Sequence, residues 1–148
     1  MPDHQKDLII RWFEEVWNQG RRETIDEMLS PDSVLHDGEV DSRGPQEFKA
    51  FFDRMNATFS EMRLHRHEVI SEGIYACLRW SVTARHTGDA LGLPPTGREI
   101  RITGITMIRF DDGKFAEAWQ NWDMHGLIQQ ITGASAVPGV YIGTGSAG

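Results

Sequence analysis

A continuous series of structural signals from Gly92 to Ile131 constrains the fold of this 148-residue chain more than any other feature. A Pro-Pro-Thr-Gly turn precedes a segment in which apolar and polar residues alternate. A short Asp-Asp-Gly turn, a second alternating segment and a helix-like run then follow. Alternation with a period of two is typical of a strand with one buried face. The series therefore predicts an antiparallel hairpin followed by a short terminal helix, for which Asp123 is the expected N-cap.

Helical periodicity dominates the first part of the chain. Apolar residues recur at three- and four-residue spacing from Leu8 to Val16, which predicts a helix that ends near Gly20. Thr24 and Glu27 have the spacing of a capping box and predict a short second helix. A third helix is expected to begin at Gly44-Pro45, with one apolar face made of Phe48, Phe51, Phe52, Met55 and Phe59.

The hydrophobic period changes from 3.6 to 2 at Met62, which predicts that the rest of the fold is mainly sheet. Strands are expected at about 62–72, 74–86, 100–110 and 114–122, after a brief strand at 34–36. In the third of these long segments, Ile100, Ile102, Thr106, Ile108 and Phe110 share the inner face.

The hairpin register decides which residues of the last strand share that inner face. A three-residue Asp111-Asp112-Gly113 loop would place Ala116, Ala118, Gln120 and Trp122 there. A two-residue loop would instead select Phe115, Glu117, Trp119 and Asn121. We favour the first register, because small residues leave room for a cavity and because Glu117 then avoids an apolar wall.

Composition excludes several classes of function. A formal net charge of −7 argues against a nucleic-acid partner, which needs clustered Lys and Arg. Cys77 is the only cysteine, so neither an intrachain disulfide nor a cysteine-based zinc site can form. No secretory signal and no run of 18 apolar residues occurs, so we expect a cytoplasmic protein with no membrane span.

Short motifs in the second half of the chain carry a family resemblance. They are Pro94-Pro95-Thr96-Gly97-Arg98, Asp112-Gly113-Lys114, Trp119, Trp122-Asp123 and Gly126-Leu127. In this order, after an amphipathic N-terminal helix, they resemble the SnoaL-like polyketide cyclases of the nuclear-transport-factor-2-like superfamily. The resemblance implies an α+β domain over residues 1–132, and composition marks a Gly/Ala/Ser-rich tail at 133–148. Its fold would be a cone-shaped barrel, in which a strongly bent, mostly antiparallel sheet encloses the N-terminal helices.

The resemblance also implies a set of candidate catalytic residues. In these cyclases an aspartate shortly after the hairpin acts as acid and base, and that position is Gln120 here. A histidine that assists it corresponds to about Thr106. Neither side chain can exchange a proton at useful pH, so His36 becomes the candidate base, with Gln120 and Thr106 orienting oxygens. We expect His36, Trp80, Thr106, Gln120 and Trp122 to converge on one cavity.

The expected function is that of a cofactor-independent cyclase that closes a ring by an aldol-type reaction on an ester-bearing polyketide. A small hydrophobic ligand, for example a polycyclic one, would contact Trp17, Phe52, Met55, Trp80, His86 and Trp122, and no metal is expected. The alternatives are a non-catalytic binding protein, or a hydroxylase or hydrolase, on the same scaffold.

Apolar residues on the outer sheet face predict a homodimer. In the favoured register this face carries Ile105, Met107, Phe115 and Trp119. Adjacent apolar area of this kind is rarely left in water, and a two-fold contact between copies is its commonest cover.

Overall fold

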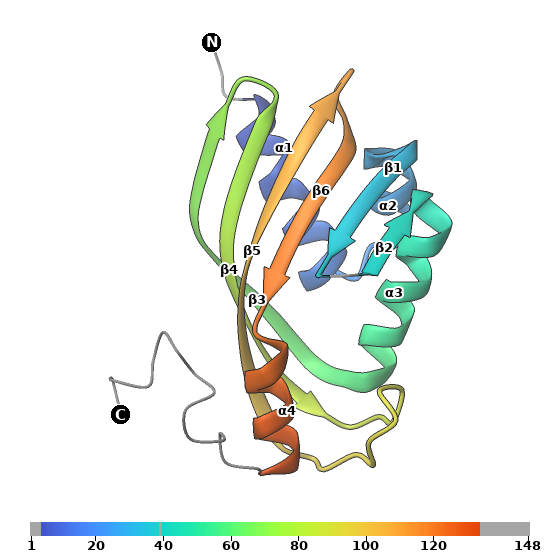
Figure 1. Cartoon of the computed structure of the whole chain (residues 1–148), viewed down its shortest axis with the longest axis vertical. Helices are drawn as coiled ribbons and strands as arrows, with labels where there is room; N and C mark the ends of the chain where they lie inside the picture. Colours follow the sequence, from blue (N-terminus) through green and yellow to red (C-terminus); the bar gives the residue numbers. More distant parts are fainter. Residues whose placement is uncertain (1–3, 39, 134–148) are drawn as a thin grey trace.

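Most of the helical residues precede Phe59, and strands form most of the chain from Phe59 to Trp122 (Figure 1). The structure is a computed structural model that describes residues 4–38 and 40–133. The elements are α1 (His4–Trp12), η1 (Phe13–Asn18), α2 (Glu23–Met28), β1 (Leu29–Asp37), β2 (Val40–Arg43), α3 (Gly44–Thr58), β3 (Phe59–Glu72), β4 (Tyr75–His86), β5 (Glu99–Asp111), β6 (Lys114–Trp122) and α4 (Met124–Thr132).

Within the described residues, six strands form one mixed sheet in the order β2-β1-β6-β5-β4-β3. Neighbouring strands are antiparallel except for β1 and β6, which run parallel. The prediction of an α+β fold with a mostly antiparallel sheet and N-terminal helices is therefore confirmed. Strong bending of the sheet into a cone stays a prediction, as does the division into a domain and a tail. Residues 134–148 of that tail lie outside the described residues.

The predicted first helix is confirmed, but its second half changes geometry. Ile9, Trp12, Phe13 and Val16 are buried along one side, as the spacing of apolar residues requires. From Phe13 onward the helix widens into a π-helix, and the chain turns at Gly20, where φ is +66°.

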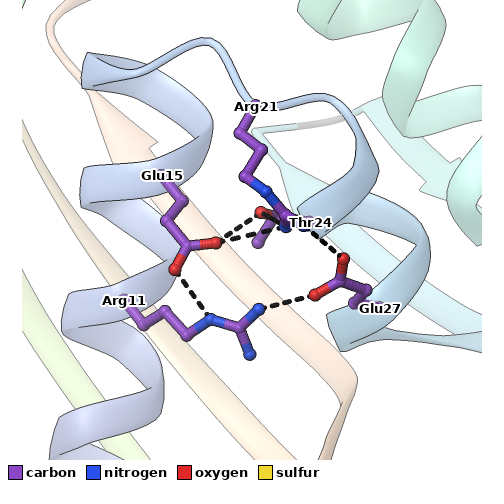
Figure 2. Close-up of polar contacts among 5 residues, drawn as sticks. All are labelled: Arg11, Glu15, Arg21, Thr24 and Glu27. Atoms are coloured by element: carbon purple, nitrogen blue, oxygen red, sulfur yellow. Dashed lines mark hydrogen bonds and ion pairs between the residues drawn. The ribbon is translucent and has the colours of Figure 1, made fainter.

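The capping box predicted for the second helix is wrong. Thr24 lies inside α2, and its hydroxyl donates to Glu15 Oε1 at 2.6 Å. Glu27 accepts hydrogen bonds from Arg11 and Arg21 instead of returning to a backbone N–H, as Figure 2 shows. These side chains join α2 to the helix before it. Thr24 and Glu27 therefore make tertiary contacts instead of capping the helix. Their spacing in the sequence is the same in both cases, so it does not distinguish a cap from a tertiary contact.

The N-terminal part of the sheet is larger than the sequence predicted. β1 begins at Leu29, five residues before the expected strand, and β2 was not expected at all. α3 does begin at Gly44-Pro45, as predicted. β1 and β2 together extend the sheet beyond β6, so that the end of β1 becomes part of the inner face.

The hairpin between β5 and β6 differs from the three-residue loop that we favoured. Asp112 and Gly113 form a two-residue turn with φ values of 51° and 75°, and Asp111 lies opposite Lys114. Positive φ at both central residues is the pattern of the tight turn that best fits the twist of a hairpin.

A bulge in β6 nevertheless restores three of the four favoured inner-face residues, and the exception is Ala116, which is the bulge residue itself. Phe110 pairs with Phe115 and Arg109 pairs with Glu117, so Ala116 is the extra residue. Beyond the bulge, Ala118, Gln120 and Trp122 pair with the buried residues Ile108, Thr106 and Gly104. The outer-face position predicted for Phe115 is wrong: it is 2% exposed and its ring centroid lies 5.0 Å from that of Trp12.

The two faces of the sheet have different surroundings. α1, η1 and α3 pack against the inner face, where the alternating residues of β4 and β5 are buried. α4 begins at Asp123, whose carboxylate accepts from the backbone N–H of Gly126 at 2.8 Å, as predicted for an N-cap. In the part of the chain that the structure describes, no helix is long and apolar enough to cross a membrane.

Candidate active site

A narrow inner cavity lies between the helices and the sheet. Its volume is about 70 Å³, and aromatic and aliphatic side chains from η1, α3, β3, β4 and β5 form most of its wall. Gln120 is the amide in this lining. The predicted ligand contacts Trp17, Met55, Trp80 and Trp122 all line this cavity.

A wider outer cavity of about 440 Å³ adjoins it. The two cavities share Phe51, Met55, Gln120 and Trp122 in their walls. The outer cavity also carries charged residues, which are Asp37, Asp41, Glu47 and Arg54. Its volume lies in the range of small-molecule sites, and its mixed lining offers both apolar contact and hydrogen bonds.

Polar side chains from three adjacent strands form a row that is centred on Gln120, which lines both cavities. Thr106 of β5 lies opposite Gln120 of β6, which lies opposite Asp37 of β1. The Trp80 indole N–H donates to Thr106 Oγ1 at 3.0 Å, and the Thr106 hydroxyl donates to Gln120 Oε1 at 3.0 Å. Asp37 Oδ1 accepts the indole N–H of Trp122, also at 3.0 Å. The result is a row of linked polar groups in an otherwise apolar wall.

Asp37 has the most unusual electrostatic environment in this row. Burial raises the pKa of its carboxyl group, and hydrogen bonds from Trp122 and Gln120 oppose that rise only in part. A carboxylate with a raised pKa is a stronger base than an exposed one. Because Asp37 also lines the outer cavity, its geometry and its proton affinity both suit proton transfer to or from a ligand.

The prediction that His36 faces the cavity is wrong. Its Nδ1 lies 2.8 Å from Asp41 Oδ1, its Nε2 lies 2.7 Å from Glu117 Oε2, and its ring stacks on Trp119. The hydrogen bond with Glu117 raises the pKa of His36 most, and the hydrogen bond with Asp41 raises it further. The physical reason is strand alternation: consecutive residues of β1 point to opposite faces, so Asp37 is inward and His36 outward.

Three other predicted site residues need comment. Phe51 rather than Phe52 lines the cavities, while Phe52 is buried against Trp17 with ring centroids 5.5 Å apart. His86 is fully buried at the end of β4, where its Nδ1 accepts the backbone N–H of Thr96 at 3.2 Å. It holds the loop before β5 and is not among the residues that line either cavity. Thr106 is buried beside Gln120, and it meets the site through that amide.

Comparison with known proteins gives this geometry a family context. The family model described as "SnoaL-like polyketide cyclase" matches residues 7–131. The chain belongs to the SnoaL-like polyketide cyclase family.

Relatives of this family member include two named cyclases. The chain is 29% identical over 130 residues to the aklanonic acid methyl ester cyclase of Streptomyces peucetius, covering 83% of this chain and 88% of the relative. It is 29% identical over 120 residues to the nogalonic acid methyl ester cyclase of Streptomyces nogalater, covering 78% and 88%. A crystal structure of a putative polyketide cyclase from Acidithiobacillus ferrooxidans matches with 26% identity and a TM-score of 0.79, covering 91% and 99%.

Asp37 is a candidate site residue that was not predicted from the sequence of this SnoaL-like family member. Val34 and Leu35 are both apolar, so local alternation does not show which of the next two residues points inward. The inward direction follows from the parallel pairing of Leu35 with Ala118 and of Asp37 with Gln120. The only local signal at Asp37 is its position directly before Gly38, and that position is typical of a turn residue, not of a residue in a site.

Proposed function

We propose that this protein is a cofactor-independent polyketide ester cyclase in which Asp37 is the acid and base. The observation that carries the proposal is a half-buried carboxylate of raised pKa in the wall of the outer cavity, beside Gln120 and Trp122, which line both cavities. The family's cyclases use an aspartate at the position of Gln120, according to the resemblance. Because Asp37 pairs directly with Gln120, it offers a carboxylate to the same region from the neighbouring strand.

The proposed reaction is an internal aldol addition. Asp37 removes a proton from a carbon next to a carbonyl group, and the C–H electron pair becomes an enolate. The enolate carbon forms a bond to a second carbonyl carbon of the same molecule, whose oxygen becomes an alkoxide. That alkoxide takes the proton back from Asp37, so the product is an isomer of the substrate and no redox partner is needed.

The cavity walls suit a flat, oxygenated substrate. Trp80 and Trp122 present aromatic surface, and Phe51 and Met55 line both cavities, so one molecule in contact with these two side chains can reach into each cavity. The Gln120 amide lies beside the base, where it can hold a carbonyl oxygen as negative charge develops on it. Arg54, at the wall of the outer cavity, supplies a positive charge on the same side as Asp41 and Glu47.

Turnover of the methyl esters of aklanonic acid and nogalonic acid tests this proposal. Asp37→Asn keeps the shape of the side chain but removes its basicity, so kcat/KM should fall about 10²- to 10⁴-fold. For the wild type, kcat/KM should rise with pH as Asp37 ionises, with an apparent pKa above the ordinary aspartate value of about 3.9. The neighbouring His36→Asn variant is the control and should lose much less. Full activity in Asp37→Asn would exclude this base.

One observation favours a second candidate, a binding protein that does not turn over its ligand. Gln120 replaces the aspartate that the family resemblance places there, so the usual proton-transfer residue is missing. In that case ligand affinity would be measurable by titration, no product would form, and Asp37→Asn would change affinity only modestly.

We also propose that the protein functions as a homodimer. On the outer face, Ile105 is 48% exposed and Met107 is 38% exposed, and Met107 lies opposite Trp119 on the neighbouring strand. Two-fold contact between these faces would cover all three side chains without closing the cavities, which lie on the other side of the sheet.

A further inference from the structure

The amide of Gln120 has two ends, and its neighbours determine which end faces Asp37. An amide oxygen only accepts hydrogen bonds, whereas the NH₂ group only donates them. The two ends have similar shape, so the hydrogen-bond network decides the orientation. At Gln120 that network begins two side chains away, at Trp80.

The network has a single direction of donation. The Trp80 indole nitrogen is a donor only, so Thr106 Oγ1 must accept from it at 3.0 Å. The Thr106 hydroxyl hydrogen is then free to donate, and its acceptor is Gln120 Oε1 at 3.0 Å. Trp80 and Thr106 are 7% and 3% exposed, so water does not readily replace either bond.

We propose that Trp80 and Thr106 are positioning residues, which hold the Gln120 amide with its NH₂ group toward Asp37. With the oxygen engaged by Thr106, the NH₂ end remains for the carboxylate on the next strand and for a substrate oxygen. The opposite orientation would place an amide oxygen against a carboxylate, and two acceptors repel each other. This inference rests on the proposed function only in taking Asp37 as the base.

Other charged groups near Asp37 do not explain this arrangement. The outer cavity also carries Asp41, Glu47 and Arg54. Asp41 is engaged by Nδ1 of His36, and Glu47 accepts from the backbone N–H of Arg43. A substitution at Thr106 leaves all of these groups in place, so its effect on Asp37 reports on the amide.

Titration of Asp37 by carbon-13 NMR of its carboxyl group tests the proposal without requiring turnover. Thr106→Val keeps the volume but removes the hydroxyl, so the amide loses its fixed orientation and Asp37 loses a donor. Its titration should then move to higher pH. Thr106→Ser keeps the hydroxyl and should titrate like the wild type. Below the midpoint, kcat/KM of Thr106→Val should fall about 2- to 10-fold, the range expected for one hydrogen bond.

A double-mutant cycle shows whether Thr106 acts through Gln120. Gln120→Leu should move the Asp37 titration in the same direction, and adding Thr106→Val to it should cause no further change. An unchanged Asp37 titration in Thr106→Val, or shifts that add in the double variant, would overturn the proposal. Loss of activity by the same factor at every pH would likewise indicate a packing role. Failure of the proposed function would show separately, as activity retained in Asp37→Asn.

Discussion

At the scale of single residues, Asp37 combines a chemical use with a cost to stability. Burial raises its pKa, which means that the folded state binds this proton more tightly than the unfolded state does. The contribution of Asp37 to stability is therefore fully present below the ordinary aspartate pKa of about 3.9. It is lost as the pH rises through the raised value, because a charge must then remain in the cavity wall.

Asp37→Asn should therefore stabilise the protein at neutral pH while reducing its activity. The amide cannot ionise, so the gain in free energy of unfolding over the wild type should be small at about pH 4 and should grow as the pH rises through the raised pKa. Urea unfolding of both proteins across that range measures it. A variant that is less stable than the wild type at every pH would contradict the prediction.

The sequence predicted the inward or outward direction of some side chains correctly and of others wrongly. Alternation in β4 and β5 correctly placed Trp80 and Thr106 inward, because each strand has several apolar residues in phase. The direction of Gln120 depended on Ala116, whose bulge compensated for a shorter turn. His36 was misplaced because β1 is fixed by pairing with β6, which lies about 80 residues away in the chain and leaves no local signal.

At the scale of elements, a glycine inside β5 makes room for the Trp80 indole of the site. Gly104 lies between Trp80 on β4 and Trp122 on β6. A Cβ atom at this position would lie 2.3 Å from Cζ2 of Trp80, which is too close for any stable contact. Glycine within a strand often marks such a close approach. The cavity wall therefore depends on the absence of a side chain here.

Gly104→Ala should lower both stability and activity. The Trp80 ring would have to move, which strains the core by about 1–3 kcal/mol and weakens its hydrogen bond to Thr106. Chemical denaturation measures the first effect, and kcat/KM the second. Thr103→Ala, an exposed change one residue away, should stay within about 0.5 kcal/mol of the wild type. Equal stability of the two variants would show that Trp80 moves freely.

The ends of β1, β2 and β6 are joined on the outer face by His36. Glu117 and then Asp41 raise its pKa, and His36 in turn lowers the pKa of Glu117. A raised histidine pKa gives stability that is fully present below about pH 6.5 and is lost as the pH rises through the folded value. The side chains are about 30–40% exposed, so solvent screening keeps the effect small.

His36→Gln should remove this part of the pH dependence. Its deficit in stability relative to the wild type should be greatest below about pH 6.5 and should shrink toward about pH 9. Thermal unfolding at a series of pH values measures the deficit. If the deficit grew with rising pH, the ion pairs around His36 would not be the cause.

At the scale of the whole molecule, the two faces of the sheet differ: one carries the cavities and the other carries exposed apolar side chains. Its inner face carries the cavities and the polar row, and helices cover much of it. Its outer face presents Ile105, Met107 and part of Trp119, in a region with charged residues such as Arg109 and Glu117. Because site and outer face lie on opposite sides, association between copies can stabilise the sheet without blocking a ligand.

The dimer proposal predicts that Met107→Glu weakens self-association. In a two-fold contact this change places a carboxylate from each copy in an apolar interface, where neither has a partner. The sedimentation coefficient at micromolar concentration should fall toward the monomer value, while the far-ultraviolet spectrum stays unchanged because Met107 points outward. Met124→Glu is the matched control, since Met124 is similarly exposed at 47% but lies in α4. A wild-type protein that sediments as a monomer at this concentration would show that the outer face is not a contact between copies.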